Sequence, residues 1–213
     1  MAGVTRVKIC GNTSLDDARL AVDLGAWAIG LIFVPGTPRV VDEDVAARIA
    51  AELRRRTELV GVFVNAPLER VAAVADAVGL TMLQLHGDEG PSYCAEAARR
   101  TGCRVVKAAR VRSRADLTAL EAFHTDLHML DAHVEGARGG TGRTWDWDLV
   151  AARRASTPLI VSGGLTPENV GEAIAATAPY AVDVASGVES EPGRKDPERL
   201  EAFFRAAGAV GVR

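Results

Sequence analysis

Residues 6–10 read RVKIC, a short apolar segment with a lysine at its centre, and seven more short apolar segments follow along the chain. The ends of successive segments are 22 to 31 residues apart, which leaves room after each for a loop and a helix. This rhythm predicts parallel strands joined by βαβ crossovers. The predicted strands are residues 6–10, 28–34, 59–64, 81–86, 104–108, 127–131, 159–162 and 181–185.

Eight such units favour closure into a single (β/α)₈ barrel domain, a TIM barrel, over residues 1–213. An open doubly wound sheet, which usually needs fewer units, is the structural alternative. Residues 13–17, TSLDD, offer a helix-capping hydroxyl followed by acidic residues. Residues 166–168, TPE, predict a helix with Pro167 at its first position. Helix ends are predicted at Gly25, Gly79 and Gly102.

The composition excludes several classes of function. No apolar run approaches the roughly 18 residues of a membrane helix, and a net charge of −3 argues against nucleic acid as a partner. Three cysteines form no even disulfide framework, which indicates a reducing cytoplasm. The sequence contains no metal-ligand cluster, Walker loop or dinucleotide fingerprint, so we expect no metal and no cofactor.

Polar residues recur inside the predicted strands. Because side chains alternate between the faces of a strand, residues two apart share one face. Three strands carry two residues that share a face in this way: Lys8 and Cys10, Gln84 and His86, and Met129 and Asp131. Two further strands each contain one charged residue, Lys107 and Asp183. A single polar residue at a strand end is often satisfied by loop backbone. Several together predict an active site at the C-terminal end of the barrel.

Motifs at nearly every strand-to-helix junction resemble those of phosphoribosylanthranilate isomerases, in the family's order. They are VKICGNT at 7–13, FVPGTPRVV at 33–41, GVFVN at 61–65, LQLHGDE at 83–89, MLDA at 129–132, GGTGRTWDW at 139–147, SGGLTPENV at 162–170 and VDVASGVESEPGRKD at 182–196. The main departure is Asn12, where an aliphatic residue is expected. The resemblance implies a small-molecule substrate, N-(5-phosphoribosyl)anthranilate, and an Amadori rearrangement in tryptophan biosynthesis.

The resemblance also implies roles for single residues. Cys10 matches the general base, and the following helix together with Lys8 would lower its pKa. Asp131 matches the general acid, and Arg39 matches the residue that binds the anthranilate carboxylate. The alternatives are a buried structural thiol at Cys10, a cap or ion-pair partner at Asp131 and a solvated loop charge at Arg39. Cys94 is expected to be structural, as is Cys103.

The phosphate group is expected on the loops after the last two strands, at Gly163, Gly164, Ser186 and Gly187, where backbone N–H groups and a helix N-terminus can approach its oxygens. Turn glycines would explain either loop alone.

Two site residues and one loop have less definite roles. Asp183 is expected to meet a substrate hydroxyl or to neutralise Lys8 or Lys107. His86 is expected to act as a hydrogen-bonding neighbour in the site, and residues 136–142 as a mobile loop over it.

Other interpretations stay open. The nearest enzyme alternative is another phosphosugar isomerase or lyase of the same barrel class. The related isomerase of histidine biosynthesis performs a similar step, but that family has aspartate where Cys10 stands. A broad-specificity enzyme that serves both pathways is a further alternative. A regulatory barrel that only binds a phosphorylated metabolite would need neither Cys10 nor Asp131. The sequence does not predict an oligomeric state.

Overall fold

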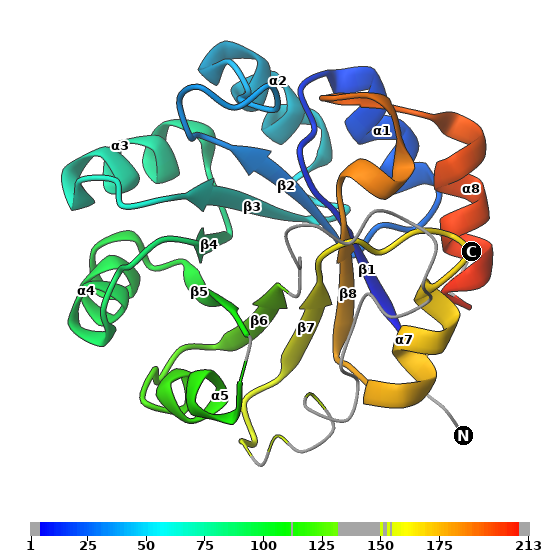
Figure 1. The fold of residues 1–213 in the computed structure, drawn as a ribbon. Helices are drawn as coiled ribbons and strands as arrows, with labels where there is room; N and C mark the ends of the chain where they lie inside the picture. The colour runs from blue at the N-terminus through cyan, green and yellow to red at the C-terminus, as the bar shows by residue number, and fades with distance from the viewer. Residues whose placement is uncertain (1–4, 112, 132–149, 151–152, 154, 209–213) are drawn as a thin grey trace.

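The structure is a computed structural model, and it describes residues 5–208 except 112, 132–149, 151–152 and 154. Eight parallel strands form a closed barrel in chain order, with helices arranged around it (Figure 1). The strands are β1 (Arg6–Ile9), β2 (Ala28–Ile32), β3 (Glu58–Phe63), β4 (Met82–Leu85), β5 (Arg104–Arg110), β6 (Leu127–Asp131), β7 (Leu159–Ser162) and β8 (Ala181–Val184). The helices are α1 (Leu15–Asp23), α2 (Glu43–Leu53), α3 (Leu68–Val78), α4 (Pro91–Thr101), α5 (Arg114–Glu121), α7 (Val170–Thr177) and α8 (Pro197–Ala206).

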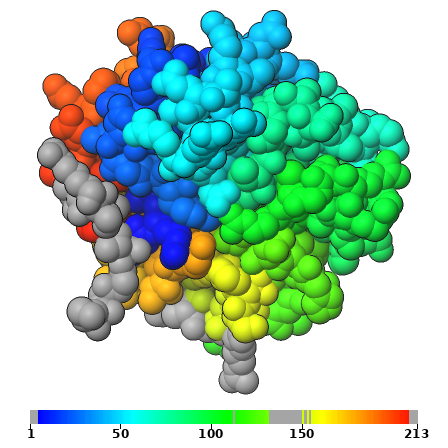
Figure 2. All heavy atoms as spheres, turned by 180° about the vertical axis from the view of Figure 1, so that it is seen from behind, coloured from blue at the N-terminus to red at the C-terminus, as the bar shows by residue number. Residues whose placement is uncertain are grey.

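The barrel closes where the first strand meets the last. Residues from Arg6 to Ile9 pair in register with residues from Ala181 to Val184. Seen from the other side, the chain runs once around the molecule, from blue through green to orange (Figure 2). The predicted barrel is therefore confirmed, and the open doubly wound sheet is wrong.

Most helix signals are confirmed. Ser14 caps α1 by accepting a hydrogen bond from the Asp17 backbone, and α3 and α4 end at left-handed Gly79 and Gly102. The predicted helix start at Pro167 is wrong, because α7 begins only at Val170.

A tight turn explains the late start of α7. The Asn169 side chain accepts a hydrogen bond from the Thr166 N–H at 2.8 Å and donates one to the Gly164 carbonyl at 3.0 Å. These side-chain bonds compete with helical ones, so the segment forms a turn before the helix can begin.

The strand alternation sorts side chains into two buried layers. Ile9, Leu85 and Leu130 pack between strands and helices, whereas Met129 lies in the barrel interior with Met82. Lys107 departs from the predicted inner group. Its Nζ atom pairs instead with Glu89 at 2.9 Å and donates to the Gly87 carbonyl at 2.7 Å, so it braces the loop after β4.

The loop after β8 contains structure that the sequence patterns did not predict. A short 3₁₀ turn, η1 (Ser186–Val188), leads into an antiparallel hairpin of β9 (Glu189–Glu191) and β10 (Arg194–Lys195). Thr13 donates a hydrogen bond to the Gly193 carbonyl, and Asp17 accepts one from the Lys195 N–H. The hairpin is thereby fixed against the start of α1. No helix among the described residues is long and apolar enough to cross a membrane.

Candidate active site

A cavity of about 260 Å³ lies at the C-terminal ends of the strands, and most of the predicted site residues line it. They are Cys10, Arg39, His86, Asp131, Gly163, Gly164, Asp183 and Ser186. The remaining one, Gly187, lines an adjacent cavity of about 420 Å³ that also touches Gly164 and Ser186. The predicted loop at 136–142 lies outside the described residues.

Cys10 directly follows β1, where its backbone N–H donates to the Val184 carbonyl at 2.8 Å. The inner face of β2 leaves room for its thiol, since a Cβ on Gly30 would stand 2.6 Å from Cys10 Sγ. Burial raises the pKa of the Cys10 thiol, although the nearby ammonium groups of Lys8 and Lys195 act in the opposite direction. The expected lowering of this pKa is therefore wrong, because loss of water outweighs the favourable charges.

A buried ion pair includes one residue of the cavity wall, Asp183. Lys8 Nζ donates to Asp183 Oδ1 at 2.6 Å, and Ser162 donates to Asp183 Oδ2 at 2.9 Å. Asp183 therefore neutralises Lys8, and the alternative partner, Lys107, lies in another layer. Burial opposes the charge on Lys8, but the interactions with Asp183 and Cys10 together outweigh it and raise the pKa of the ammonium group, which stays charged.

His86 links two other side chains of the cavity. Its Nδ1 atom lies 3.2 Å from Gln84 Nε2, and its Nε2 atom lies 3.3 Å from Asp131 Oδ2. A hydrogen bond from the Gln84 amide to Nδ1 leaves the ring proton on Nε2, where it points to the Asp131 carboxyl group. Gln84 lines the cavity, and its Oε1 atom is buried without a hydrogen-bond partner among the described residues.

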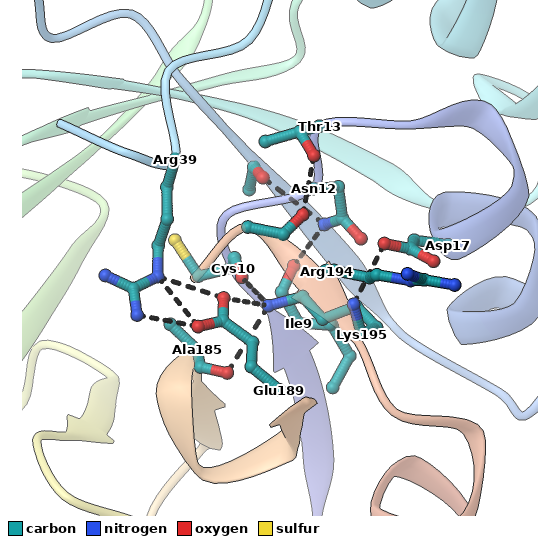
Figure 3. A network of polar contacts seen from close by, with 12 residues as sticks. Ile9, Cys10, Asn12, Thr13, Asp17, Arg39, Ala185, Glu189, Arg194 and Lys195 are labelled. Atoms are coloured by element: carbon teal, nitrogen blue, oxygen red, sulfur yellow. Dashed lines mark hydrogen bonds and ion pairs between the residues drawn. The ribbon is translucent and has the colours of Figure 1, made fainter. Parts of the chain in front are cut away.

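Arg39 lies in the loop between β2 and α2 and is not a solvated charge. Its guanidinium group binds the Glu189 carboxylate of the β9–β10 hairpin, and Glu189 in turn binds Lys195 (Figure 3). The arginine side chain is only 23% exposed, and its Cδ atom packs where a Cβ on Gly11 would stand.

Backbone geometry requires the glycines of the two loops proposed for phosphate. Gly163 and Gly164 have φ angles of 94° and 66°, which side chains rarely adopt. A Cβ on Gly187 would lie 1.9 Å from the Leu165 carbonyl oxygen, so the two loops are in backbone contact. Because α7 begins only at Val170, the expected helix N-terminus does not directly follow Gly164.

The sequence patterns missed Glu189, Lys195 and Ser162 as residues of the site. Ser162 ends a predicted strand, so the rule of alternating faces would have found it. Lys195 is one of only three lysines in the chain, but Glu189 carries no signal within a hairpin this short. Asn12, which stands where an aliphatic residue is expected, is buried and donates from Nδ2 to the Ile9 carbonyl at 2.8 Å, whereas its Oδ1 has no hydrogen-bond partner among the described residues.

Comparison with known proteins agrees with this geometry. The family model described as N-(5'-phosphoribosyl)anthranilate (PRA) isomerase matches residues 7–206. An N-(5'-phosphoribosyl)anthranilate isomerase of Citrifermentans bemidjiense is 45% identical over 98% of this chain and 100% of its own length.

Solved structures give the same result. The crystal structure of phosphoribosyl anthranilate isomerase from Thermotoga maritima is 40% identical, with a TM-score of 0.87 over 97% of this chain and 100% of that one. Another crystal structure of such an isomerase, in complex with reduced 1-(o-carboxyphenylamino)-1-deoxyribulose 5-phosphate, has 38% identity and a TM-score of 0.85, with the same coverage. The chain belongs to the phosphoribosylanthranilate isomerase family.

Proposed function

We propose that this enzyme converts N-(5'-phosphoribosyl)anthranilate into 1-(o-carboxyphenylamino)-1-deoxyribulose 5-phosphate, the Amadori step of tryptophan biosynthesis. The observation that carries the proposal is the meeting of Cys10 and Asp131 in one cavity. Strands β7 and β8 separate their two strands around the barrel, so a substrate in the cavity can contact both side chains. We also propose a cytoplasmic location, where the buried Cys10 thiol stays reduced.

The reaction needs an acid and then a base. The Asp131 carboxyl group, held by His86, donates a proton to the ring oxygen of the ribose, and the sugar opens to a cationic Schiff base. Cys10, as its thiolate, then removes the proton on C2, and the resulting enolamine tautomerises to the ketone. The positive charge of the Schiff base favours the thiolate at the moment when the base is needed, and it adds to the charges of Lys8 and Lys195.

The two ends of the substrate are both anionic. The guanidinium group of Arg39 suits the planar anthranilate carboxylate. The phosphate fits the loops at Gly163–Gly164 and Ser186–Gly187, where backbone N–H groups can approach its oxygens without a Cβ between them. Asp183 is held by Lys8 and Ser162 at the cavity wall, so it can accept a hydrogen bond from a ribose hydroxyl.

A fluorescence assay that follows consumption of phosphoribosylanthranilate by purified protein tests the proposal. Cys10→Ser and Asp131→Asn should each lower kcat by about 10²-fold or more, the scale of general acid–base catalysis, and change KM much less. Cys94→Ser is the matched control, because Cys94 is a buried thiol on α4 outside the cavity. Absence of turnover in the parent enzyme would refute the function, and parental kcat in a variant would remove that residue from the mechanism.

A further inference from the structure

Glu189 binds Arg39 along one edge of its guanidinium group. Arg39 Nε lies 2.9 and 3.0 Å from the two carboxylate oxygens, and Arg39 Nη2 lies 2.6 Å from Oε2. A guanidinium group has two edges that can bind a carboxylate: a lateral edge formed by Nε and Nη2, and an end edge formed by Nη1 and Nη2. Because Glu189 occupies the lateral edge, the end edge remains for a ligand.

Lys195 fixes Glu189 from the opposite side. Its Nζ atom donates to Glu189 Oε1 at 3.0 Å, to the Cys10 carbonyl at 2.6 Å and to the Ala185 carbonyl at 3.3 Å. These three acceptors match the three N–H groups of an ammonium ion. Figure 3 shows the result: Glu189 lies between the guanidinium group of Arg39 and the ammonium group of Lys195.

The charges of this cluster add up to one free positive charge. Arg39 and Lys195 contribute two positive charges and Glu189 contributes one negative charge. Burial opposes the charge on Glu189, but the hydrogen bonds from Arg39 and the charge of Lys195 outweigh it and lower the pKa of the carboxyl group. A ligand with one carboxylate would neutralise this net charge, and a ligand without one would leave it uncompensated.

We propose that Glu189, anchored by Lys195, is a positioning residue that acts through Arg39: it directs the end edge of the guanidinium group toward the cavity and sets the cluster's charge to accept one planar carboxylate. This inference rests on the proposed function for the identity of the carboxylate, which is that of the anthranilate group. Glu189 itself touches no reacting atom.

A double-mutant cycle tests the proposal with Glu189→Gln, Arg39→Ala and the double variant. Glutamine keeps the shape and can still accept a hydrogen bond from Lys195, so the hairpin should persist, which circular dichroism and thermal melting verify. Glu189→Gln should raise KM roughly tenfold and leave kcat within about twofold, since the carboxylate does not react. In the Arg39→Ala background the same substitution should have no further effect on KM.

Binding measurements by calorimetry separate this proposal from the proposed function. The probes are reduced 1-(o-carboxyphenylamino)-1-deoxyribulose 5-phosphate, which has the carboxylate, and ribose 5-phosphate, which lacks it. Glu189→Gln should weaken only the first. If the parent protein showed no turnover, the function would fail, but these two affinities would still test the role of Glu189.

Glu58→Gln is the matched control, because Glu58 pairs with Arg104 where strands β3 and β5 begin, at the other end of the barrel. It should leave KM and both affinities unchanged.

If Glu189→Gln does not fold, Glu189→Asp replaces it, since the shorter carboxylate cannot hold Arg39 and Lys195 together. Equal weakening of both probes, or an undiminished effect of Glu189→Gln in the Arg39→Ala background, would overturn the proposal.

Discussion

Gly30→Ala should disable the enzyme by displacing one sulfur atom. Gly30 lies on the inner face of β2, and a Cβ there would stand 2.6 Å from Cys10 Sγ and 3.1 Å from Cys10 Cα. The thiol can turn away, but the Cα atom belongs to the backbone that follows β1 and cannot. The new methyl group therefore forces Cys10 into another rotamer and strains the contact between the two strands.

The expected magnitude has two parts. Overpacking of this kind costs about 1–3 kcal/mol of the free energy of unfolding. Displacement of a reacting group by about 1 Å costs roughly 10²-fold in rate, so kcat should fall by about that factor. KM should change little, because Arg39 and the glycine loops are untouched. Thermal denaturation measures the first part, and the fluorescence assay measures the second.

Two controls isolate the contact. Gly90→Ala makes the same chemical change at a residue with φ of −78°, where the added Cβ meets no atom within 4 Å, so kcat should stay parental. In a Cys10→Ala background, Gly30→Ala should cost less stability, because Sγ is no longer there to be displaced. Parental kcat in Gly30→Ala, together with an unchanged melting temperature, would refute the described placement of Cys10.

Three further outcomes are expected. Lys8→Met leaves the Asp183 carboxylate buried without its cation, so denaturation should show a loss of about 3–5 kcal/mol; parental stability would contradict the importance of this pair. Burial raises the pKa of the Cys10 thiol, so the pH midpoint of its alkylation by iodoacetamide should lie above that of free cysteine. Mass spectrometry measures this alkylation, and a lower midpoint would show that the charges of the nearby cations outweigh burial. The folded protein then retains a proton that the unfolded chain releases, so Cys10 should lower stability only at alkaline pH, above the ordinary thiol pKa of about 8.5. Gly171→Ala, inside α7 with ordinary contact to Ala206, should raise the free energy of unfolding by about 0.5–1 kcal/mol, and a lower melting temperature would contradict this.

The barrel and much of its site could be predicted because strands have a period of two. Once the eight segments were placed, the alternation put Lys8, Cys10, Gln84 and His86 on the inner face without any further information. The placement of Lys107 on the inner face was wrong, although the alternation holds in β5: Lys107 shares the outer face with Val105 and Ala109. A lysine can be buried toward the helices when a carboxylate is there to meet it, and the sequence pattern did not reveal that Glu89 would supply one.

The rest depended on contacts between distant parts of the chain. Strands as short as β9 and β10 have no measurable periodicity, so nothing in the sequence indicated that Glu189 would meet Arg39. The pKa of Cys10 was predicted in the wrong direction for a related reason. The charge of Lys8 is visible in the sequence, whereas the loss of water around the thiol depends on the packing of the whole barrel.

The ammonium group of Lys195 also has a consequence for the order of events in folding. It joins the carbonyl groups of Cys10 and Ala185, which follow the first and last strands of the barrel, and its bond to Cys10 spans 185 positions of sequence. Such a distant pairing is slow to form, because the ends of a long loop must meet before any contact rewards them. During synthesis, Cys10 is therefore made among the first residues, but the ammonium group of Lys195 cannot reach it until the β9–β10 hairpin has left the ribosome. Catalytic competence should then be acquired in the last stage of folding, when the first and last strands are locked together.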